Sequence, residues 1–322
     1  MVQNNQQIEK IIFSRCCEEW LKQKDDTVKP SSYYNYKYSV EKHIIPVLGD
    51  KSLLELEKYD FKEFIRYKKE TIIKSKKQRD NHFEETDDIN LKALVTKLKS
   101  ILNYTTKKYH ITFDLESLAG IIYTPSEIEV FSDKDFKKLS NFLLNSNDIR
   151  DLGVLISLYT GLRIGEICGL KWSDINFEDE LLYVNRTAQR VYMGKVEKSK
   201  LIITKPKTQK SKRKIPIGKI LLKKLKEYKN QYPNEAFILT GEIDKFYEPS
   251  GYRYDYKQIL KKCKIPYKNY HRLRHSFASR CIATGMDAKS LSEILGHSNI
   301  GITMNLYVHS SNEIKKKYIN KL

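Results

Sequence analysis

Apolar residues in the N-terminal third of the chain recur at helical spacing. A first helix is predicted over residues 33–44, after two serines that can cap it, and Pro46 and Gly49 are expected to end it. Leucine, isoleucine and valine at positions i, i+3, i+4 and i+7 predict a long amphipathic helix over residues 89–109. Residues 74–90 are charged and weakly periodic, which predicts a loop or a frayed helix end. This part of the chain is therefore expected to be helical, with its apolar residues in a core.

The pattern changes after this region. Residues 110–127 lose the periodicity and contain Gly120 and Pro125, which is typical of a linker. Apolar spacing then predicts a helix capped by Ser132 or Asp133 and a second one led by Asp151. Three short runs of β-type residues follow, at 181–184, 201–204 and 213–217, and helices are predicted around 218–230, 250–262, 271–284, 287–296 and 299–308.

These elements predict a mainly α protein with a small antiparallel β-sheet. We expect a helical domain over residues 1–120, a linker over 121–127 and an α+β domain over 128–322, with a C-terminal tail over 308–322. The longest apolar run, Leu152 to Leu162, is much shorter than the roughly 20 residues that span a bilayer. A signal peptide is not evident, and five cysteines without a C-x-x-C pair suit a reducing cytoplasm.

The charge of the chain is concentrated in one segment. The 322 residues carry a formal net charge of +19, and residues 195–230 hold 14 basic and 2 acidic side chains. Such a block is often only a solvated face, but predicted strands and a helix interrupt this one, so we expect it to be folded. A folded basic ridge is typical of a surface that binds a polyanion. Nucleic acid is therefore the leading partner class, and we expect no membrane partner.

Two segments before residue 210 carry candidate chemistry. Residues 160–166 read TGLRIGE, in which Gly161 permits a tight turn and Arg163 and Glu166 share a helix face. Taken alone, this pair is equally typical of an exposed ion pair. Residues 205–208 read KPKT, in the turn between two predicted strands, where a long lysine side chain could reach into a cleft.

Two further segments carry histidines. His271, Arg274 and His275 lie on one face of a predicted helix, and histidines at i and i+4 invite a zinc site. Two arginines crowd that position and repel a dication, so we predict no metal. Residues 295–298 read LGHS, with His297 after a helix-capping glycine, and Tyr307 follows ten residues later.

Arginines, lysine and histidines together suit a phosphodiester that passes through a transition state with extra negative charge. Guanidinium groups bind the non-bridging oxygens in pairs, and donors fixed in advance stabilise the charge as it develops. A tyrosine hydroxyl needs nearby cations or a base to become a nucleophile, and a desolvated lysine can act as an acid.

These motifs, in this order, resemble those of the tyrosine recombinases, also called the phage integrase family, across nearly the whole chain. The resemblance implies that Arg163 and Arg274 clamp the scissile phosphate, that Lys207 protonates the leaving 5′-oxygen and that Tyr307 forms a 3′-phosphotyrosine. His271 and His297 would support the phosphate and the proton transfers. Glu166 and His275 match positions that orient these groups. Lys205 replaces Lys207 if the turn shifts by two residues, and we expect Lys205, Lys210, Lys212 and Arg213 to contact DNA.

The resemblance also implies a fold and an assembly. The N-terminal helices resemble the core-binding domain, which with the catalytic domain encloses duplex DNA. The first region starts almost directly at that domain, so we expect no separate arm-binding domain. We expect a cytoplasmic site-specific recombinase or integrase of a mobile element, acting as a tetramer through a Holliday junction without metal, cofactor or ATP, with a possible directionality factor. The tail packs on a neighbouring protomer or on its own domain. A type IB topoisomerase and a catalytically silent DNA-binding regulator are the alternatives.

Overall fold

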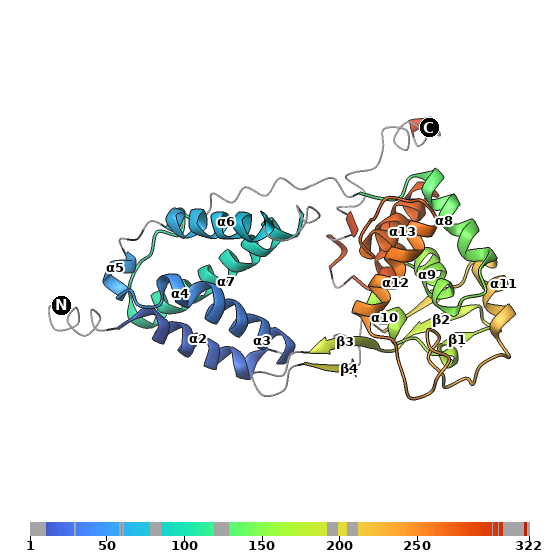
Figure 1. Ribbon diagram of the computed structural model, residues 1–322, viewed down its shortest axis with the longest axis horizontal. Helices are drawn as coiled ribbons and strands as arrows, with labels where there is room; N and C mark the ends of the chain where they lie inside the picture. Colours follow the sequence, from blue (N-terminus) through green and yellow to red (C-terminus); the bar gives the residue numbers. More distant parts are fainter. Residues whose placement is uncertain are drawn as a thin grey trace. The chain divides into compact units, whose positions relative to one another are not determined.

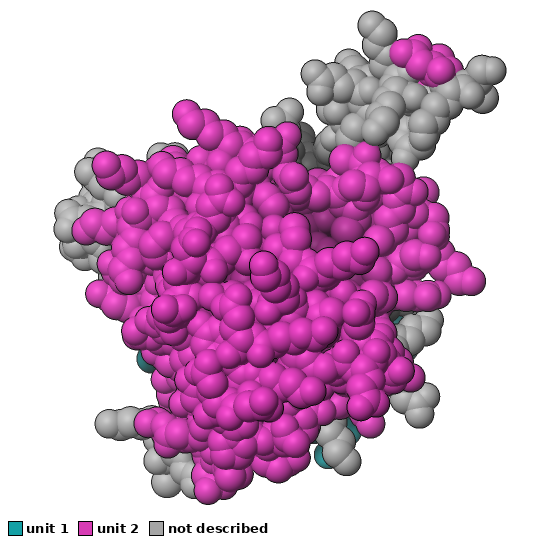
Figure 2. Space-filling model, turned by 90° about the vertical axis from the view of Figure 1, so that its right-hand side faces the viewer, with its two compact units in different colours: residues 1–125, 192–199 teal, residues 126–191, 200–322 magenta. Residues whose placement is uncertain are grey.

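The computed structural model separates the chain into two compact units, Met1–Pro125 with Tyr192–Ser199 and Ser126–Val191 with Lys200–Leu322 (Figures 1 and 2). None of the helices described is long and apolar enough to cross a membrane. The structure describes residues 11–28, 30–57, 59, 61–77, 85–118, 129–191, 199–204, 212–297, 299–301, 303–304 and 319–320.

The first unit is helical in all its described elements. Helix α7 contacts both α2 and α6, and a core that contains Trp20, Phe61 and Leu98 lies among the helices (Figure 1). The long amphipathic helix predicted from the sequence is α7, which begins four residues earlier than expected. The helices are α2 (Phe13–Thr27), α3 (Pro30–Ser39), a π-helical turn (Val40–Ile44), α4 (Ile45–Leu48), α5 (Leu53–Glu57), α6 (Phe61–Lys77) and α7 (Glu85–Tyr109).

The prediction that Pro46 ends the first helix is wrong. The chain stays helical through a π-helical turn, Val40–Ile44, and enters α4 with Pro46 in its first turn. Proline is tolerated there because the first N–H groups of a helix have no partner within it. Gly49 ends the helix as expected, and its N–H donates to the Ile45 carbonyl at 2.8 Å.

The second unit combines helices with two small antiparallel sheets, which confirms the predicted fold class. Strand β2 lies between β1 and β5, and β3 pairs separately with β4. The helices are α8 (Asp133–Asn145), α9 (Ile149–Thr160), α10 (Ile164–Cys168), a 3-10 turn (Trp172–Asp174), α11 (Lys219–Tyr228), α12 (Pro249–Lys262), α13 (His271–Ala283) and α14 (Ala288–Leu295). The strands are β1 (Ile175–Asn176), β2 (Leu181–Val184), β3 (Thr187–Val191), β4 (Lys200–Thr204) and β5 (Arg213–Pro216).

The pairing of β4 corrects the expectation of one sheet with a hairpin turn at residues 205–208. Ile203 of β4 faces Ala188 of β3, whereas Ile215 of β5 faces Leu182 of β2. The two strands that flank the lysine segment therefore belong to different sheets. Strand β3, with which β4 pairs, was not predicted from the sequence.

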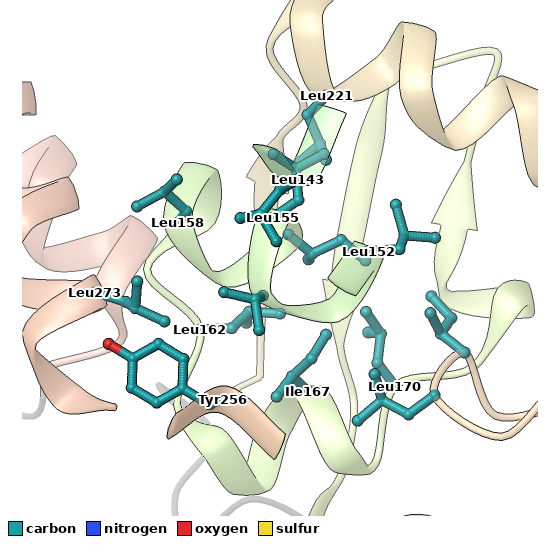
Figure 3. Close-up of a cluster of buried hydrophobic side chains, with 14 of the residues drawn as sticks. Leu143, Leu152, Leu155, Leu158, Leu162, Ile167, Leu170, Leu221, Tyr256 and Leu273 are labelled. Atoms are coloured by element: carbon teal, nitrogen blue, oxygen red, sulfur yellow. The ribbon is translucent and has the colours of Figure 1, made fainter. Parts of the chain in front are cut away.

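Helix α9 is the centre of the second unit. Nine of its 12 residues are buried, and leucines from α8, α11 and α13 surround it together with Ile167 of α10 (Figure 3). A smaller cluster of Ala278, Ile282, Leu291 and Leu295 joins α13 to α14. The ends of α9 and α14 and the start of α13 are thus fixed by apolar packing, and these ends carry the candidate functional residues.

Candidate active site

The end of α9 is shaped by Gly161. This residue caps α9 with a φ of 68°, in the left-handed region that favours glycine. A Cβ at this position would lie 2.7 Å from a ring carbon of Phe277 and 2.9 Å from a methyl carbon of Leu295. The chain therefore passes close to α13 and α14 before Arg163 begins α10, and glycine is required for both reasons.

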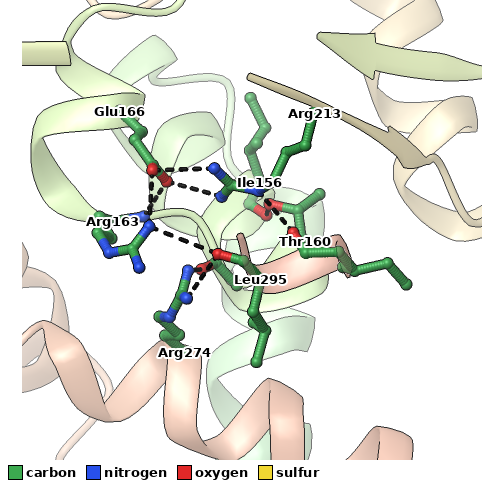
Figure 4. A network of polar contacts seen from close by, with 9 residues as sticks. Ile156, Thr160, Arg163, Glu166, Arg213, Arg274 and Leu295 are labelled. Atoms are coloured by element: carbon green, nitrogen blue, oxygen red, sulfur yellow. Dashed lines mark hydrogen bonds and ion pairs between the residues drawn. The ribbon is translucent and has the colours of Figure 1, made fainter. Parts of the chain in front are cut away.

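Glu166 is the buried centre of a polar network (Figure 4). Its Oε1 accepts hydrogen bonds from Arg163 NH1 at 2.9 Å and from Arg213 NH1 at 3.0 Å. Its Oε2 accepts from the Arg163 backbone N–H and from Arg213 NH2, both at 2.9 Å. Burial alone would raise the pKa of Glu166, but Arg213 and Arg163 lower it to about 2, so the carboxylate is ionised at neutral pH.

Arg274 reaches the same place from α13. Its side chain is buried, with NH1 donating to the Gly161 carbonyl at 3.0 Å and NH2 to the Leu295 carbonyl at 2.6 Å (Figure 4). Burial and the charge of Arg163 lower the pKa of Arg274, but a guanidinium stays protonated at neutral pH. Because Arg163 NH1 also lies 3.4 Å from the Leu295 carbonyl, the two arginines meet at the C-terminal end of α14.

The three histidines are held next to these cations. The rings of His271 and His275 contact edge to face, with centroids 4.6 Å apart. His297 follows the left-handed cap Gly296, and its Nδ1 lies 2.7 Å from the Thr303 hydroxyl. Desolvation lowers the pKa of each histidine to about 4, and the charge of Arg274 adds to this effect at all three. The imidazoles are therefore neutral at pH 7 and can accept protons.

The structure brings most of the described candidate residues into one region. Arg163 is hydrogen-bonded to Glu166, and Arg274 and Arg163 both donate to the Leu295 carbonyl. The positive charges of Arg274 and Arg163 add to the effect of burial in lowering the pKa of His271 and of His297. The remaining candidates, Lys205, Lys207, Lys210 and Tyr307, lie outside the described residues, so their roles stay predictions.

Lys212 and Arg213 have different environments, although both were predicted to contact DNA. Lys212 is exposed and lines a groove of about 740 Å³ together with Gly296 and His297. Arg213 lines the same groove, but its side chain is 4% exposed and pairs with Glu166, which leaves little of its surface for the expected DNA contact. The alternation along β5 could have shown this, because Arg213 is in phase with the buried Ile215 and Ile217.

A metal site is not evident in the described segments of the chain, which contain no group of three or more His, Cys, Asp and Glu side chains that could hold an ion. The site is dominated by guanidinium groups, and its one buried carboxylate is fully used by two arginines. Such an arrangement can bind an anion and stabilise negative charge that develops on it.

Comparison with known proteins matches both parts of the chain. The model of the phage integrase family matches residues 129–313, and the model of the phage integrase N-terminal SAM-like domain matches residues 12–76. A "Tyrosine recombinase XerC-like" protein of Caldanaerobacter subterraneus subsp. tengcongensis is 34% identical over 243 residues, which cover 68% of this chain and 62% of that protein. The ICEBs1 integrase of Bacillus subtilis is 23% identical over 309 residues, 91% of this chain and 78% of the relative. The chain thus spans less than two thirds of the length of the first of these relatives.

Solved structures show the same fold. The Tn1549 transposon integrase in complex with transposon right end DNA has a TM-score of 0.74 at 20% identity, over 97% of this chain and 99% of that chain. A lambda integrase tetramer bound to a Holliday junction has a TM-score of 0.62 at 17% identity, over 92% of this chain and 77% of that chain.

Proposed function

The chain belongs to the phage integrase family, and on this premise we propose that it is a site-specific recombinase that breaks and rejoins double-stranded DNA. The observation that carries the proposal is the convergence of Arg163 and Arg274 on the Leu295 carbonyl at the end of α14, close enough to His297 for both charges to affect its pKa. Two guanidinium groups with N–H donors in fixed positions suit the non-bridging oxygens of one phosphodiester.

The proposed chemistry is a transfer of the phosphoryl group to tyrosine. The hydroxyl oxygen of Tyr307 attacks the phosphorus and loses its proton to a neutral imidazole, for which His271 and His297 are the candidates. A bond forms between this oxygen and the phosphorus, and the bond to the 5′-oxygen breaks. Lys207 gives its proton to that oxygen, and Lys205 is the alternative donor. The product is a 3′-phosphotyrosine, from which a 5′-hydroxyl of another strand can release Tyr307.

The proposed assembly is a tetramer on two DNA sites, which exchanges strands through a Holliday junction. The lambda integrase structure is described as such a tetramer, and the Tn1549 integrase structure contains transposon DNA, which supports a role in moving a genetic element. Lys212, at the edge of the groove beside His297, is the described lysine that we propose to contact DNA, together with Lys205 and Lys210. Because the substrate is cellular DNA, we infer a cytoplasmic reaction, in which a directionality factor can select integration or excision.

The test is covalent trapping on nicked duplexes made from the DNA that flanks the gene. Wild-type protein is expected to form a denaturant-resistant adduct at one position, and the Tyr307→Phe variant is expected to bind the same DNA without forming it. Tyr254→Phe, which changes an exposed tyrosine on the surface of α12, is the matched control and should react like wild type. Adducts from Tyr307→Phe would show that another residue is the nucleophile, and tight binding without any adduct from wild type would favour a silent DNA-binding regulator.

A second measurement separates a recombinase from a topoisomerase. A synthetic four-way junction built from the bound fragment should be resolved into recombinant duplexes by a recombinase. Relaxation of supercoiled DNA without any junction resolution would support the type IB topoisomerase instead.

A further inference from the structure

Arg213 is a buried cation in a strand whose other inward side chains are apolar. It is the first residue of β5, and its side chain is 4% exposed. Removing a guanidinium from water is costly unless charged and hydrogen-bonding partners replace the solvent. The hydrogen-bonding partners of Arg213 indicate why a buried arginine is useful at this position.

These partners come from two of the segments that hold the candidate phosphate site. The Nε of Arg213 donates to the Ile294 carbonyl at 2.6 Å, in the last turn of α14. Its NH1 and NH2 groups donate to the two oxygens of Glu166, at 3.0 and 2.9 Å. One rigid, planar group therefore connects α10 to the C-terminal end of α14, which a lysine ammonium cannot do with the same geometry.

The bidentate pair with Arg213 limits how Arg163 can use Glu166. In the described part of the chain, the side chain of Arg163 donates through NH1 alone, to Glu166 and the Leu295 carbonyl. Without Arg213, both carboxylate oxygens would be open to a bidentate pair with Arg163. A bidentate pair with Glu166 would use N–H groups of Arg163 that otherwise face the phosphate site. It would turn the guanidinium of Arg163 away from a bound phosphate.

The turn before His297 also rests on Arg213. Gly296 has a φ of 65°, and a Cβ at this position would lie 3.0 Å from the Cδ and 3.2 Å from the NH1 of Arg213. The side chain of Arg213 is thus packed against the backbone from which His297 projects. Its aliphatic part and its guanidinium both define where this turn lies.

We propose that Arg213 is a positioning residue, which saturates Glu166 so that Arg163 faces the phosphate, and which fixes the Gly296 turn that presents His297. The inference rests on the proposed function for its effect on the reaction. In this role Arg213 does not contact DNA. Removing its side chain should therefore slow the chemical step and leave the affinity for DNA unchanged.

The kinetic test compares Arg213→Lys and Arg213→Met with wild type under single-turnover conditions on the trapped nicked duplex. Both variants are expected to form the adduct about 100-fold more slowly, the cost of a small misplacement of catalytic groups, with DNA binding as in wild type. Arg186→Lys is the matched control, because Arg186 pairs with the buried Asp174 of the same unit. It should react like wild type. Equal slowing in this control, or a normal rate in Arg213→Lys, would overturn the proposal.

A double-mutant cycle tests whether Arg213 acts through Glu166. If it does, Arg213→Met should cost much less in a Glu166→Gln background than in wild type, because the carboxylate that it controls is already gone. Losses that simply multiply would show two independent effects and would contradict the proposed role.

A spectroscopic arm does not depend on the reaction. In protein with 15N-labelled histidine, Arg213→Lys should shift the ring signals of His297, and Arg186→Lys should leave them in place. Unmoved His297 signals would refute the positioning role whether or not the chain forms an adduct. Conversely, shifted signals in a chain that forms no adduct would uphold the role of Arg213 and refute the proposed function.

Discussion

Replacing Glu166 by glutamine tests how much the buried network stabilises the second unit. Each oxygen of Glu166 accepts two hydrogen bonds, from Arg163 and Arg213. In Glu166→Gln, one oxygen becomes an amide nitrogen that can only donate, so two of the four bonds are lost in either orientation of the amide. Hydrogen bonds to charged groups contribute about 1.5–3 kcal/mol each, so the loss of two should lower the unfolding free energy by about 3–6 kcal/mol.

Urea unfolding followed by tryptophan fluorescence measures this loss. Trp172 lies in the core of the second unit and Trp20 in that of the first, so a Trp20→Phe background makes the signal specific to the second unit. Glu242→Gln is the matched control, because Glu242 and its partner Lys245 are both exposed. It should cost no more than about 0.5 kcal/mol, as is usual for surface ion pairs.

The pH dependence gives the same test a sign. The pKa of Glu166 is lowered to about 2 in the folded protein, so its stabilising effect is present above the unfolded value and is lost as the pH falls towards 2. The difference between wild type and Glu166→Gln should therefore narrow below about pH 4. A loss under about 1 kcal/mol at neutral pH, or a difference that does not change in acid, would refute the reasoning.

Three further predictions concern the turns and histidines of the site. Gly161→Ala should lower the unfolding free energy by about 2–4 kcal/mol, because alanine is strained at positive φ and its Cβ would meet two side chains. Gly251→Ala should be neutral or stabilising, because Gly251 lies inside a helix and a Cβ there would make only an ordinary contact, 3.5 Å from a ring carbon of Tyr247. Thermal melts compare the two variants. Thr303→Val should slow adduct formation about 10-fold and leave the melting temperature unchanged, because His297 loses the hydroxyl group that orients its ring. An unchanged rate would show that this contact is dispensable. The pKa of His275 and of His297 is about 4 in the folded protein and about 6.5 in the unfolded chain. The free energy of unfolding should therefore be greatest above about pH 6.5 and should fall as the pH drops towards 4, because the unfolded chain then binds more protons. Urea midpoints that do not decrease between about pH 7.5 and 5 would contradict this.

Periodicity alone predicted the helices well where one face is apolar. The predicted ranges at 89–109, 250–262 and 271–284 agree with α7, α12 and α13 to within a few residues, because burial of that face decides the structure. The effect of Pro46 was misjudged because a proline does not end a helix when it lies in the first turn of a new helical segment. Here α4 begins at Ile45, directly after the π-helical turn. Strand β3, with the sequence TAQRV, lacks a run of β-type residues and is formed by pairing with β4.

The candidate site was only partly legible in the sequence, because much of it is backbone. Arg274 donates to the carbonyl oxygens of Gly161 and Leu295. Arg213 donates to the carbonyl of Ile294, and Arg163 to that of Leu295. Any residue type supplies such a carbonyl, so the sequence does not mark these acceptors. Motif spacing could therefore indicate which side chains meet but not which atoms hold them. The burial of Arg213 was missed for a different reason, because the basic residues near it outweighed the alternation along β5 that places its side chain inside.

The charge that results is the strongest link between this geometry and the proposed reaction. Arg163, Arg213 and Arg274 carry three positive charges against the single negative charge of Glu166, which leaves a net charge of +2. The neighbouring His271 and His297 are neutral at pH 7, because burial and, after it, the charge of Arg274 lower the pKa of both to about 4. A phosphodiester brings one negative charge and its pentacoordinate transition state brings a second one, so the site matches the transition state better than the ground state. That difference is what accelerates a reaction.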